Sequence, residues 1–555
     1  MRFIYALLLI SFSSFAQKGI QVTYNNYSNG NISDDDVILF IGNQQQGLIT
    51  KKAIFDKKVK SFPKEKKFIN YNNKIVTSQA EIGDNKFIIT NDSTSLKNAK
   101  LELTNETKDI LGYKCKLAKT NINSNNIEIW YTNDVPFKGG PSILGQDLGL
   151  VLEINRNNTF STKAKEVTKI AKLDNKELTA NSNATYADAL AYQDYIWKSK
   201  FTTLPIFKNE VISFNDSNKS NDSILKFGNG TVIIRKIKFP KIGKTDQVFV
   251  DLEEKSNGDA YDRTGSVFII PTTKEQSFFT GLTKGINTLP IYENGNGKKY
   301  QGIIQTKNYL PAVELMRFFT PFGVGHFNGF QMKDKTWQES VFYRQDISEL
   351  YQQLSGKDIY VGVFIGNYDK GGHEVSLNIT IHNDEKKYFN FNYSDPLFNT
   401  TNLLEMGGQE YGSMFDSEKG LEVTFTLDKE VKNAMLRYIT TGHGGWENGD
   451  EFVPKTNTIL LDQAEVFKFI PWKQDCGSYR AYNPVSGNFD NGLSSSDYSR
   501  ANWCPGTVTN PMMIALGDLK PGTHTITIKI PQGKPEGNSF SFWNVSGVLL
   551  GNTAF

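Results

Sequence analysis

The stretch Val375-Ser376-Leu377-Asn378-Ile379-Thr380-Ile381 alternates strictly between apolar and polar residues. A period of two residues places all the apolar side chains on one face of an extended chain, so the stretch predicts a β-strand with one buried face. Its β-branched residues favour the same conformation. We therefore expect this strand to belong to a sheet that packs against a second layer.

The same signal recurs along the whole chain. Further strands are predicted at 37–41, 127–131, 247–251, 360–365 and 523–528. Asn-Gly pairs predict tight turns at 29–30, 294–297, 448–449 and 491–492. The one clear helical stretch is 186–198, in which Tyr186, Leu190 and Trp197 share a face. The predicted fold class is all-β, built from repeated sandwiches.

The strand pattern is interrupted twice. The first interruption, at 174–205, combines polar residues, the helical stretch and Leu204-Pro205, and the second is the charged run 383–387. We therefore predict three folded units, at 17–200, 205–385 and 386–555. A chain of 555 residues has room for about three or four domains of ordinary size.

Residues 1–16 have the features of a secretory signal peptide. Arg2 supplies a positive charge, residues 4–10 are apolar, and Ser14-Phe15-Ala16 resembles a cleavage site. The apolar run is too short for a permanent membrane span, and no later segment reaches about 18 apolar residues. We expect a secreted or periplasmic protein without a membrane span, in which a disulfide can form.

Charge and residue counts argue against several classes of function. The 62 basic and 59 acidic residues leave a net charge of +3, too small a positive excess for nucleic-acid binding. The chain has three Cys and five His, no two His lie four residues apart, and motifs for metalloproteases, nucleotide binding and serine hydrolases are absent. We expect a monomer that uses neither a metal nor a cofactor. Aromatic residues make up 12% and could stack on sugar faces.

Three segments concentrate side chains suited to hydrolysis or sugar binding. The first is Asp259-Ala260-Tyr261-Asp262-Arg263, which follows a predicted strand and a turn. A guanidinium beside a carboxylate lowers the pKa of the carboxyl group, so Arg263 could keep Asp262 ionised as a general base. The alternative is an ordinary surface ion pair beside a turn.

The other two segments are loops. Segment 441–452 holds four Gly, three carboxylates, His443 and Trp446, whose indole could stack on a sugar. The alternative for it is a glycine-rich hairpin with solvated acids. Segment 498–506 places an Arg and a Trp beside Cys504, and its alternative is a Cys-anchored loop with no ligand.

In this order, the segments resemble motifs of the peptide-N-glycosidase F family, secreted bacterial amidases that remove N-linked glycans. The resemblance rests on Tyr261-Asp262-Arg263, the Gly442-His443 loop and Trp503-Cys504-Pro505-Gly506, with support from 317–325 and 434–437. It covers about residues 210–555, and 264–315 differs in length. It implies two side-by-side jelly-roll β-sandwiches for 205–555, with the active site at their interface.

The resemblance also implies roles. Asp262 matches the family's essential acid and would orient or deprotonate the attacking water, with Tyr261 in place of a Trp before it. Glu451 matches the second carboxylate, which would hold the first N-acetylglucosamine. Arg500 matches an arginine that would pair with both carboxylates and keep them ionised. Trp503 would line the cleft.

A third carboxylate of the family has no direct counterpart. Two ways of anchoring the comparison place Gly366 or Gly362 there, and glycine has no carboxylate. We hypothesise that Glu447, on the glycine-rich loop, supplies it as a third catalytic acid. The alternative is a site with two carboxylates. Further substrate contacts are expected from Tyr261, Arg263, His443, Trp446 and Tyr368.

Two of the three cysteines match a family disulfide. A bond between Cys476 and Cys504 would contribute about 3–4 kcal/mol, according to the chain-entropy model, and would fix segment 500–503 in place. Cys115 is left over and is expected to be a buried thiol of the N-terminal unit.

Segment 17–200 is similar instead to the GLPGLI family of exported proteins, through 110–116 and 129–132. That resemblance implies a separate, mainly-β domain and no mechanism. For the whole chain the expected activity is hydrolysis of the amide bond between asparagine and N-acetylglucosamine in N-glycosylated peptides or proteins, which gives aspartate and a glycosylamine. Two classes stay open: a non-catalytic glycan-binding protein and an endo-acting glycosidase.

Overall fold

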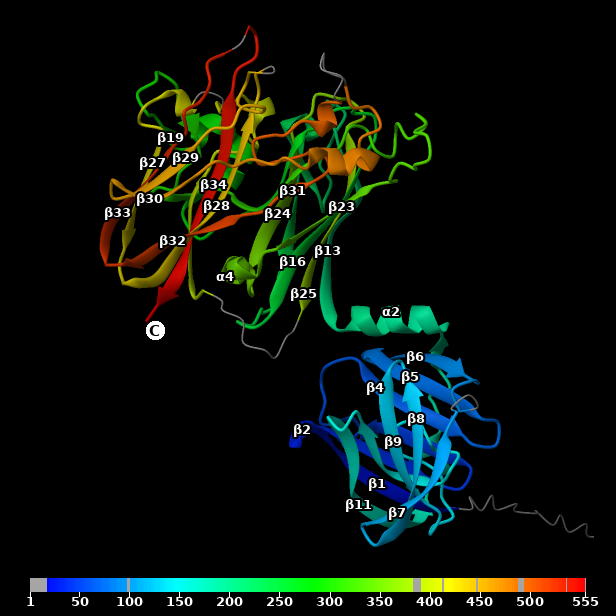
Figure 1. Cartoon of the computed structure of the whole chain (residues 1–555). Coiled ribbons are helices and arrows are strands. Elements are labelled where there is room, and N and C mark those ends of the chain that lie inside the picture. The colour runs from blue at the N-terminus through cyan, green and yellow to red at the C-terminus, as the bar shows by residue number, and fades with distance from the viewer. Residues whose placement is uncertain are drawn as a thin grey trace, which may run out of the picture. The chain divides into compact units, whose positions relative to one another are not determined.

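The computed structural model describes residues 17–554, apart from 97–99, 383–390, 412–413, 446–447, 488–493 and 536. The chain divides into two compact units, one ending at Phe201 and one beginning at Thr202 (Figure 1). Both are built mainly from strands, and every stretch predicted as a strand is one, so the all-β prediction is confirmed. No helix among the described residues is long and apolar enough to cross a membrane.

Two of the predicted boundaries fall outside the described residues, namely the signal peptide at 1–16 and the second interruption at 383–387. The division of the chain into three units stays a prediction. Of the predicted turns, Asn29-Gly30 connects the first two strands with φ of 49° and 82°, and 491–492 lies outside the described residues.

The N-terminal unit contains one sheet of twelve strands. Its order is β12-β6-β5-β4-β3-β2-β1-β11-β10-β9-β8-β7, so two antiparallel meanders meet where β1 pairs with β11. The strands are β1 (Gln17–Ser28), β2 (Asn31–Gly42), β3 (Gln46–Lys51), β4 (Lys64–Asn70), β5 (Ile75–Gly83), β6 (Lys86–Asp92), β7 (Glu102–Ile110), β8 (Tyr113–Ile122), β9 (Asn125–Thr132), β10 (Leu150–Arg156), β11 (Phe160–Leu173) and β12 (Thr185–Tyr186). Cys115 is a buried free thiol on β8, as expected.

The predicted helix is present, but the face named from the sequence is not the one that packs on the sheet. Helix α2 spans Ala189–Ser199, because Asp188 caps it by accepting hydrogen bonds from two backbone N–H groups. Tyr192 and Ile196 pack against β5 and β6, whereas Leu190 is 84% exposed. The predicted face began at Tyr186, which lies on β12 before the cap, so the true helix turns a different face to the sheet.

The second unit begins with a sandwich of two sheets. A four-stranded sheet (β13-β25-β16-β23) packs on a six-stranded one (β14-β15-β24-β17-β22-β31), with a continuous apolar core between them. The strand that opened the prediction is β25, and its apolar side chains are buried on one face. The strands are β13 (Phe201–Ile212), β14 (Leu225–Phe227), β15 (Val232–Lys238), β16 (Gln247–Ser256), β17 (Thr264–Ile270), β22 (Val313–Phe319), β23 (Val341–Asp346), β24 (Asp358–Ile365), β25 (His373–His382) and β31 (Val508–Thr509).

A second sandwich follows, made of two four-stranded sheets, β26-β34-β28-β32 and β27-β33-β29-β30. Its strands are β26 (Tyr393–Asn399), β27 (Leu421–Leu427), β28 (Val431–His443), β29 (Asn457–Leu461), β30 (Ala464–Phe469), β32 (Met512–Leu519), β33 (Gly522–Lys529) and β34 (Phe542–Thr553). Figure 1 shows the two sandwiches side by side, as the resemblance implied.

Short elements complete the chain. The paired strands are β18 (Gln276–Ser277) with β21 (Tyr309–Leu310), and β19 (Ile291–Tyr292) with β20 (Tyr300–Gln301). The α-helices are α1 (Lys52–Phe55), α3 (Phe278–Lys284) and α4 (Tyr351–Leu354). The 3-10 helices are η1 (Asn175–Leu178), η2 (Gly228–Gly230), η3 (Ile286–Thr288), η4 (Ser348–Leu350), η5 (Glu405–Gly407), η6 (Met414–Asp416), η7 (Cys476–Tyr482) and η8 (Ser495–Asp497).

Two buried arginines join the sandwiches. Arg317 of β22 donates to the hydroxyl of Thr441 (3.1 Å) and to the carbonyl of Asn544 (2.6 Å), both in the second sandwich. Arg437 of β28 donates in the opposite direction, to the carbonyls of Glu314 and Leu315, each at 3.0 Å. Because these side chains are buried and hydrogen-bonded, they fix the two sandwiches against each other. The chain itself crosses as well, because β31 pairs with β22 in the first sandwich but lies between β30 and β32 of the second in the sequence.

Candidate active site

Three connections between strands bring charged side chains together where the sandwiches meet. Asp262 lies between β16 and β17, Glu451 between β28 and β29, and Arg500 between β30 and β31. A cavity of about 270 Å³ opens beside the two carboxylates. Its lining includes the carboxylates Asp262, Glu405 and Glu451, together with Arg263, Tyr368, Tyr411, His443, Trp503 and Phe542.

Arg500 contacts both predicted carboxylates. Its Nη1 lies 3.2 Å from Oδ2 of Asp262 and also pairs with Oε1 of Glu451, while the arginine side chain is only 1% exposed. The guanidinium carbon is 4.4 Å from the ring centroid of Trp503. Oδ2 of Asp262 is buried and has no hydrogen-bond partner among the described residues. Its interaction with Arg500 is therefore the electrostatic one of the ion pair.

Burial decides the protonation of the two carboxyl groups, Asp262 and Glu451. It raises the pKa of Glu451 to about 7; the positive charge of Arg500 opposes this rise, and the charge of Asp262 adds to it. Burial also raises the pKa of Asp262, again against Arg500. For both carboxyl groups desolvation outweighs the charge of Arg500 and raises the pKa, so the expected ionisation of Glu451 by Arg500 is only partial near neutral pH. Near neutral pH the pair can hold a carboxylate and a carboxylic acid side by side.

The sequence suggested that Arg263 pairs with its neighbour Asp262, but in the structure it does not. It binds Asp259 instead, with Nε–Oδ2 and Nη2–Oδ1 distances of 2.7 and 3.2 Å. Buried His373 lies between Asp259 (3.4 Å) and Glu254 (2.8 Å). Burial lowers the pKa of His373, but the hydrogen bonds to Asp259 and Glu254 outweigh it and raise the pKa to about 9. This charged network fixes the loop that presents Asp262.

Glycine and a buried acid shape the loop that presents Glu451. Gly444 has φ of 74°, and a Cβ there would lie 2.1 Å from the carbonyl oxygen of Phe540, so only glycine fits. Asp450 accepts hydrogen bonds from the backbone of Gly533 and from the indole of Trp543. It is therefore buried and structural, unlike the solvated acid of the hairpin alternative.

The aromatic residues predicted to bind substrate differ in exposure. Trp503 lines the cavity but is only 3% exposed, because it stacks on Phe319 with a centroid distance of 4.3 Å. His443 is buried against Phe542, and burial holds its pKa well below the ordinary value, so the ring is neutral. Tyr261 and Tyr368 are exposed, with their ring centroids 5.0 and 5.8 Å from the guanidinium of Arg263.

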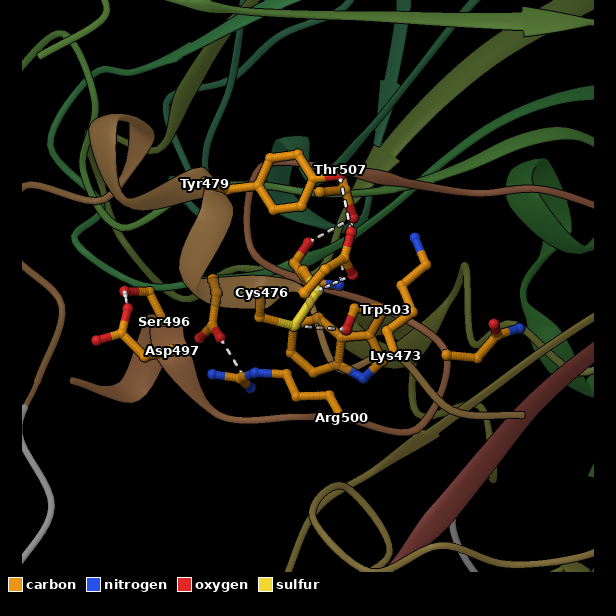
Figure 2. Close-up of a disulfide and its surroundings, with 12 residues drawn as sticks. Lys473, Cys476, Tyr479, Ser496, Asp497, Arg500, Trp503 and Thr507 are labelled. Carbon is orange, nitrogen blue, oxygen red and sulfur yellow. Dashed lines mark hydrogen bonds and ion pairs between the residues drawn. A yellow bond between two sulfur atoms is a disulfide. The ribbon is translucent and has the colours of Figure 1, made fainter. Parts of the chain in front are cut away.

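Figure 2 shows the Cys476–Cys504 disulfide beside Arg500 and Trp503. Arg500 also exchanges two backbone hydrogen bonds with Lys473, at 2.9 and 3.0 Å. The predicted disulfide is thus present, and the segment that carries Arg500 and Trp503 is held at both ends.

Some predicted residues cannot be placed, and others were missed. Trp446 and Glu447 lie outside the described residues. Glu405 and Tyr411 line the cavity although the sequence drew no attention to them, and no local motif marks either residue. No group of three or more potential metal ligands occurs among the residues that the structure describes.

Fold and site together define a two-sandwich protein with two carboxylates that share one arginine at the sandwich interface. Family models match most of the chain: "Peptide-N-glycosidase F, N terminal" at 203–381, "Peptide-N-glycosidase F, C terminal" at 410–550 and "N-glycanase peptide, N-terminal domain" at 22–194. The chain therefore belongs to the peptide-N-glycosidase F family. Its N-terminal segment, for which the sequence suggested the GLPGLI family, matches an N-glycanase domain.

Solved structures agree with this assignment. The structures of PNGF-II in space groups C2 and P21 are each 55% identical to this chain, cover 97% of it, and have TM-scores of 0.88 and 0.90. The matches span 99% and 100% of those chains. Recombinant PNGase F matches at 16% identity, covering 64% of this chain and 96% of its own, with a TM-score of 0.42. A search of curated proteins gave no match.

Proposed function

We propose that the protein is a peptide-N4-(N-acetyl-β-glucosaminyl)asparagine amidase. Membership of the family supports N-glycanase activity in general. The observation that carries the specific reaction is the pair of carboxylates that share one guanidinium beside a cavity: Oδ2 of Asp262 and Oε1 of Glu451 both pair with Nη1 of Arg500. A base and an acid so close together suit hydrolysis of an amide by activated water.

The proposed reaction uses both carboxyl groups. Asp262 takes a proton from a water molecule, whose oxygen attacks the side-chain carbonyl carbon of the glycosylated asparagine. The C–N bond then breaks, and Glu451, in its protonated form, hydrogen-bonds the first sugar and gives its proton to the leaving nitrogen. Arg500 stabilises the negative charge that develops. The products are aspartate in the peptide and a glycosylamine, which later loses ammonia in water.

The exposed aromatic residues provide a binding surface for the substrate. Tyr261 and Tyr368 both place their rings near the Arg263 guanidinium, and Asp259 holds that guanidinium in place. Flat apolar rings beside fixed donors suit a sugar or a peptide backbone. We propose that these residues contact the glycopeptide at the mouth of the cavity.

Mass spectrometry of a treated N-glycopeptide tests the reaction. We expect loss of the whole glycan and aspartate in place of asparagine. In water labelled with a heavy oxygen isotope, the new aspartate should carry the label. A peptide that keeps one N-acetylglucosamine would instead show a glycosidase, and an unchanged glycopeptide that still binds would show a glycan-binding protein.

Stability should depend on pH through Glu451. Its pKa of about 7 exceeds the ordinary 4.5, so the folded protein retains a proton that the unfolded chain has released. This contribution to stability is complete below about pH 4.5 and is lost as pH rises through about 7. Replacing Glu451 with Gln should therefore stabilise the protein relative to wild type by a margin that grows from about pH 5 to about pH 8, on the order of 1–3 kcal/mol.

Thermal unfolding across that pH range measures the effect. Glu422→Gln is a suitable control, because Glu422 is a surface residue of β27 that pairs with Lys419. A difference between Glu451→Gln and wild type that shrinks with rising pH would contradict the assignment.

Three further expectations become proposals. The disulfide at Cys476–Cys504 supports export to an oxidising compartment, since such bonds persist there. The separate family matches at 22–194, 203–381 and 410–550 support three domains. An N-glycosylated peptide or protein is the proposed partner.

A further inference from the structure

A fully buried histidine lies behind the loop that presents Asp262. His373 begins β25, and its Nδ1 is 2.8 Å from Oε1 of Glu254, while its Nε2 is 3.4 Å from Oδ2 of Asp259. Both carboxylates are as buried as the histidine. A neutral imidazole has one N–H and could donate toward only one of them, whereas an imidazolium has two. The geometry therefore suits the charged form.

The charge balance of this buried cluster points the same way. Glu254 and Asp259 bring two negative charges, and Arg263, which binds Asp259, brings one positive charge. The sum is zero only when His373 carries a proton. The hydroxyl of Tyr343 also faces Glu254, at 3.5 Å, but burial holds its pKa well above the ordinary value, so it stays neutral. An uncompensated buried charge is strongly destabilising.

Neighbouring charges are compensated outside the cluster. Asp262 pairs with Arg500, and Lys255 pairs with Glu374, the residue opposite it on β25, at 2.9 Å. The balance of Glu254 and Asp259 therefore depends on His373 and Arg263 alone.

Asp259 connects the histidine to the active-site loop. Its Oδ1 accepts a hydrogen bond from the backbone N–H of Tyr261, at 3.1 Å, and both of its oxygens accept from the guanidinium of Arg263. Buried Thr320 accepts from the backbone N–H of Arg263 (2.7 Å) and donates to the carbonyl of Tyr261 (3.0 Å). The residues on both sides of Asp262 are thus held, and a shift of Asp259 would move Asp262.

We propose that His373 is a positioning residue: as an imidazolium it holds Asp259, and through Asp259 the loop of Asp262 and Arg263, in the active arrangement, so that loss of its proton lowers activity in alkaline solution. The inference rests on the proposed function, because it concerns the activity of the same site. His373 does not line the cavity and takes no part in proton transfer to the substrate.

The test is the pH dependence of His373→Gln. Gln is close to histidine in size and stays neutral at every pH. We expect the ratio of kcat/KM, wild type to variant, to be about 10- to 100-fold at about pH 7, as for a misplaced catalytic group, and to fall toward one by about pH 10. The wild-type histidine, with a pKa of about 9, is then neutral as well. The titration of Glu451 is common to both proteins and cancels in the ratio.

A control and a rescue variant accompany it. His382→Gln lies at the far end of β25 on its outer face, and its ratio should stay near one throughout. Glu254→Gln combined with His373→Gln removes one charge of each sign and leaves Asp259 balanced by Arg263. This double variant should recover at least about threefold of the activity lost in His373→Gln, since only the imbalance is repaired. No recovery would refute the role of charge balance.

Thermal unfolding gives a readout that needs no activity. The pKa of His373 is raised from 6.5 to about 9, so its contribution to stability is complete below about pH 6.5 and is lost as pH rises through about 9. The advantage of wild type over His373→Gln should narrow across this range, and an advantage that widens would overturn the inference.

The outcomes separate this inference from the proposed function. If wild type releases glycan and the activity ratio does not change with pH, the inference is overturned and the proposed function stands. If wild type releases no glycan, the proposed function fails and the positioning role fails with it, whatever the unfolding curves show. If His373→Gln does not fold, the ratio of wild type to the charge-balanced double variant decides, and it must fall as pH rises.

Discussion

Replacing Asp262 with Asn should reduce glycan release by about 10²–10⁴-fold, the usual contribution of a general base. Asn keeps the shape of the side chain but cannot take a proton from water. The folded protein should be at least as stable as wild type, because burial disfavours the ionised form of Asp262 and raises its pKa, whereas Asn carries no charge. Loss of activity without loss of stability would separate a catalytic role from a structural one.

The measurements are kcat on an N-glycopeptide and the thermal unfolding midpoint of the same preparation. Asp428→Asn, in the exposed turn between β27 and β28, serves as control and should behave as wild type. If the activity of Asp262→Asn stays within tenfold of wild type, Asp262 is not the general base.

Replacing Arg500 with Met should lower both the free energy of unfolding and the activity. Both losses should exceed those caused by substituting a surface residue. The substitution leaves Asp262 and Glu451 without the cation that they share in a buried position. Removing one partner of a buried ion pair typically costs about 3–5 kcal/mol. The deficit should grow with rising pH, because both carboxyl groups can take up protons in acid and so avoid the uncompensated charge.

Chemical unfolding at acidic and at mildly alkaline pH measures the deficit. Arg344→Met is the matched control, because Arg344 forms an exposed ion pair with Asp251. Such a pair is worth about 0–1 kcal/mol. Equal losses in the two variants, or a deficit for Arg500→Met that shrinks as pH rises, would show that Arg500 does not compensate the buried pair.

The fold could be predicted from local pattern because its strands are half-buried. In β25 every second side chain from Val375 to Ile381 is in the core, and that periodicity is visible in one dimension. The face of α2 that packs on the sheet was not found from the sequence, because the first residue of the helix depends on a single capping side chain. Asp188 begins the helix after Tyr186 has already joined the sheet, and a shift of a few residues rotates the predicted apolar face away from the core.

The site was less accessible to sequence reasoning. Its segments stand far apart in the chain, and local neighbours gave the wrong partner for Arg263, since Asp259 competes for it and is itself held by His373 from another strand. Glu405 was missed for a similar reason. It sits in a short turn, and only the fold brings it to Tyr368 and to the space at Gly366. The desolvation that raises the pKa of Glu451 likewise exists only in three dimensions.

The crossing contacts of Arg317 and Arg437 have a consequence for engineering. Each arginine lies on a strand of one sandwich and donates hydrogen bonds to acceptors of the other, while Asp262 and Glu451 come from opposite sides of the same boundary. The sandwiches are therefore not modules that can be exchanged between relatives one at a time. A chimera that replaces either half must also import the matching hydrogen-bond acceptors, or it will lose its docking surface and its chemistry together.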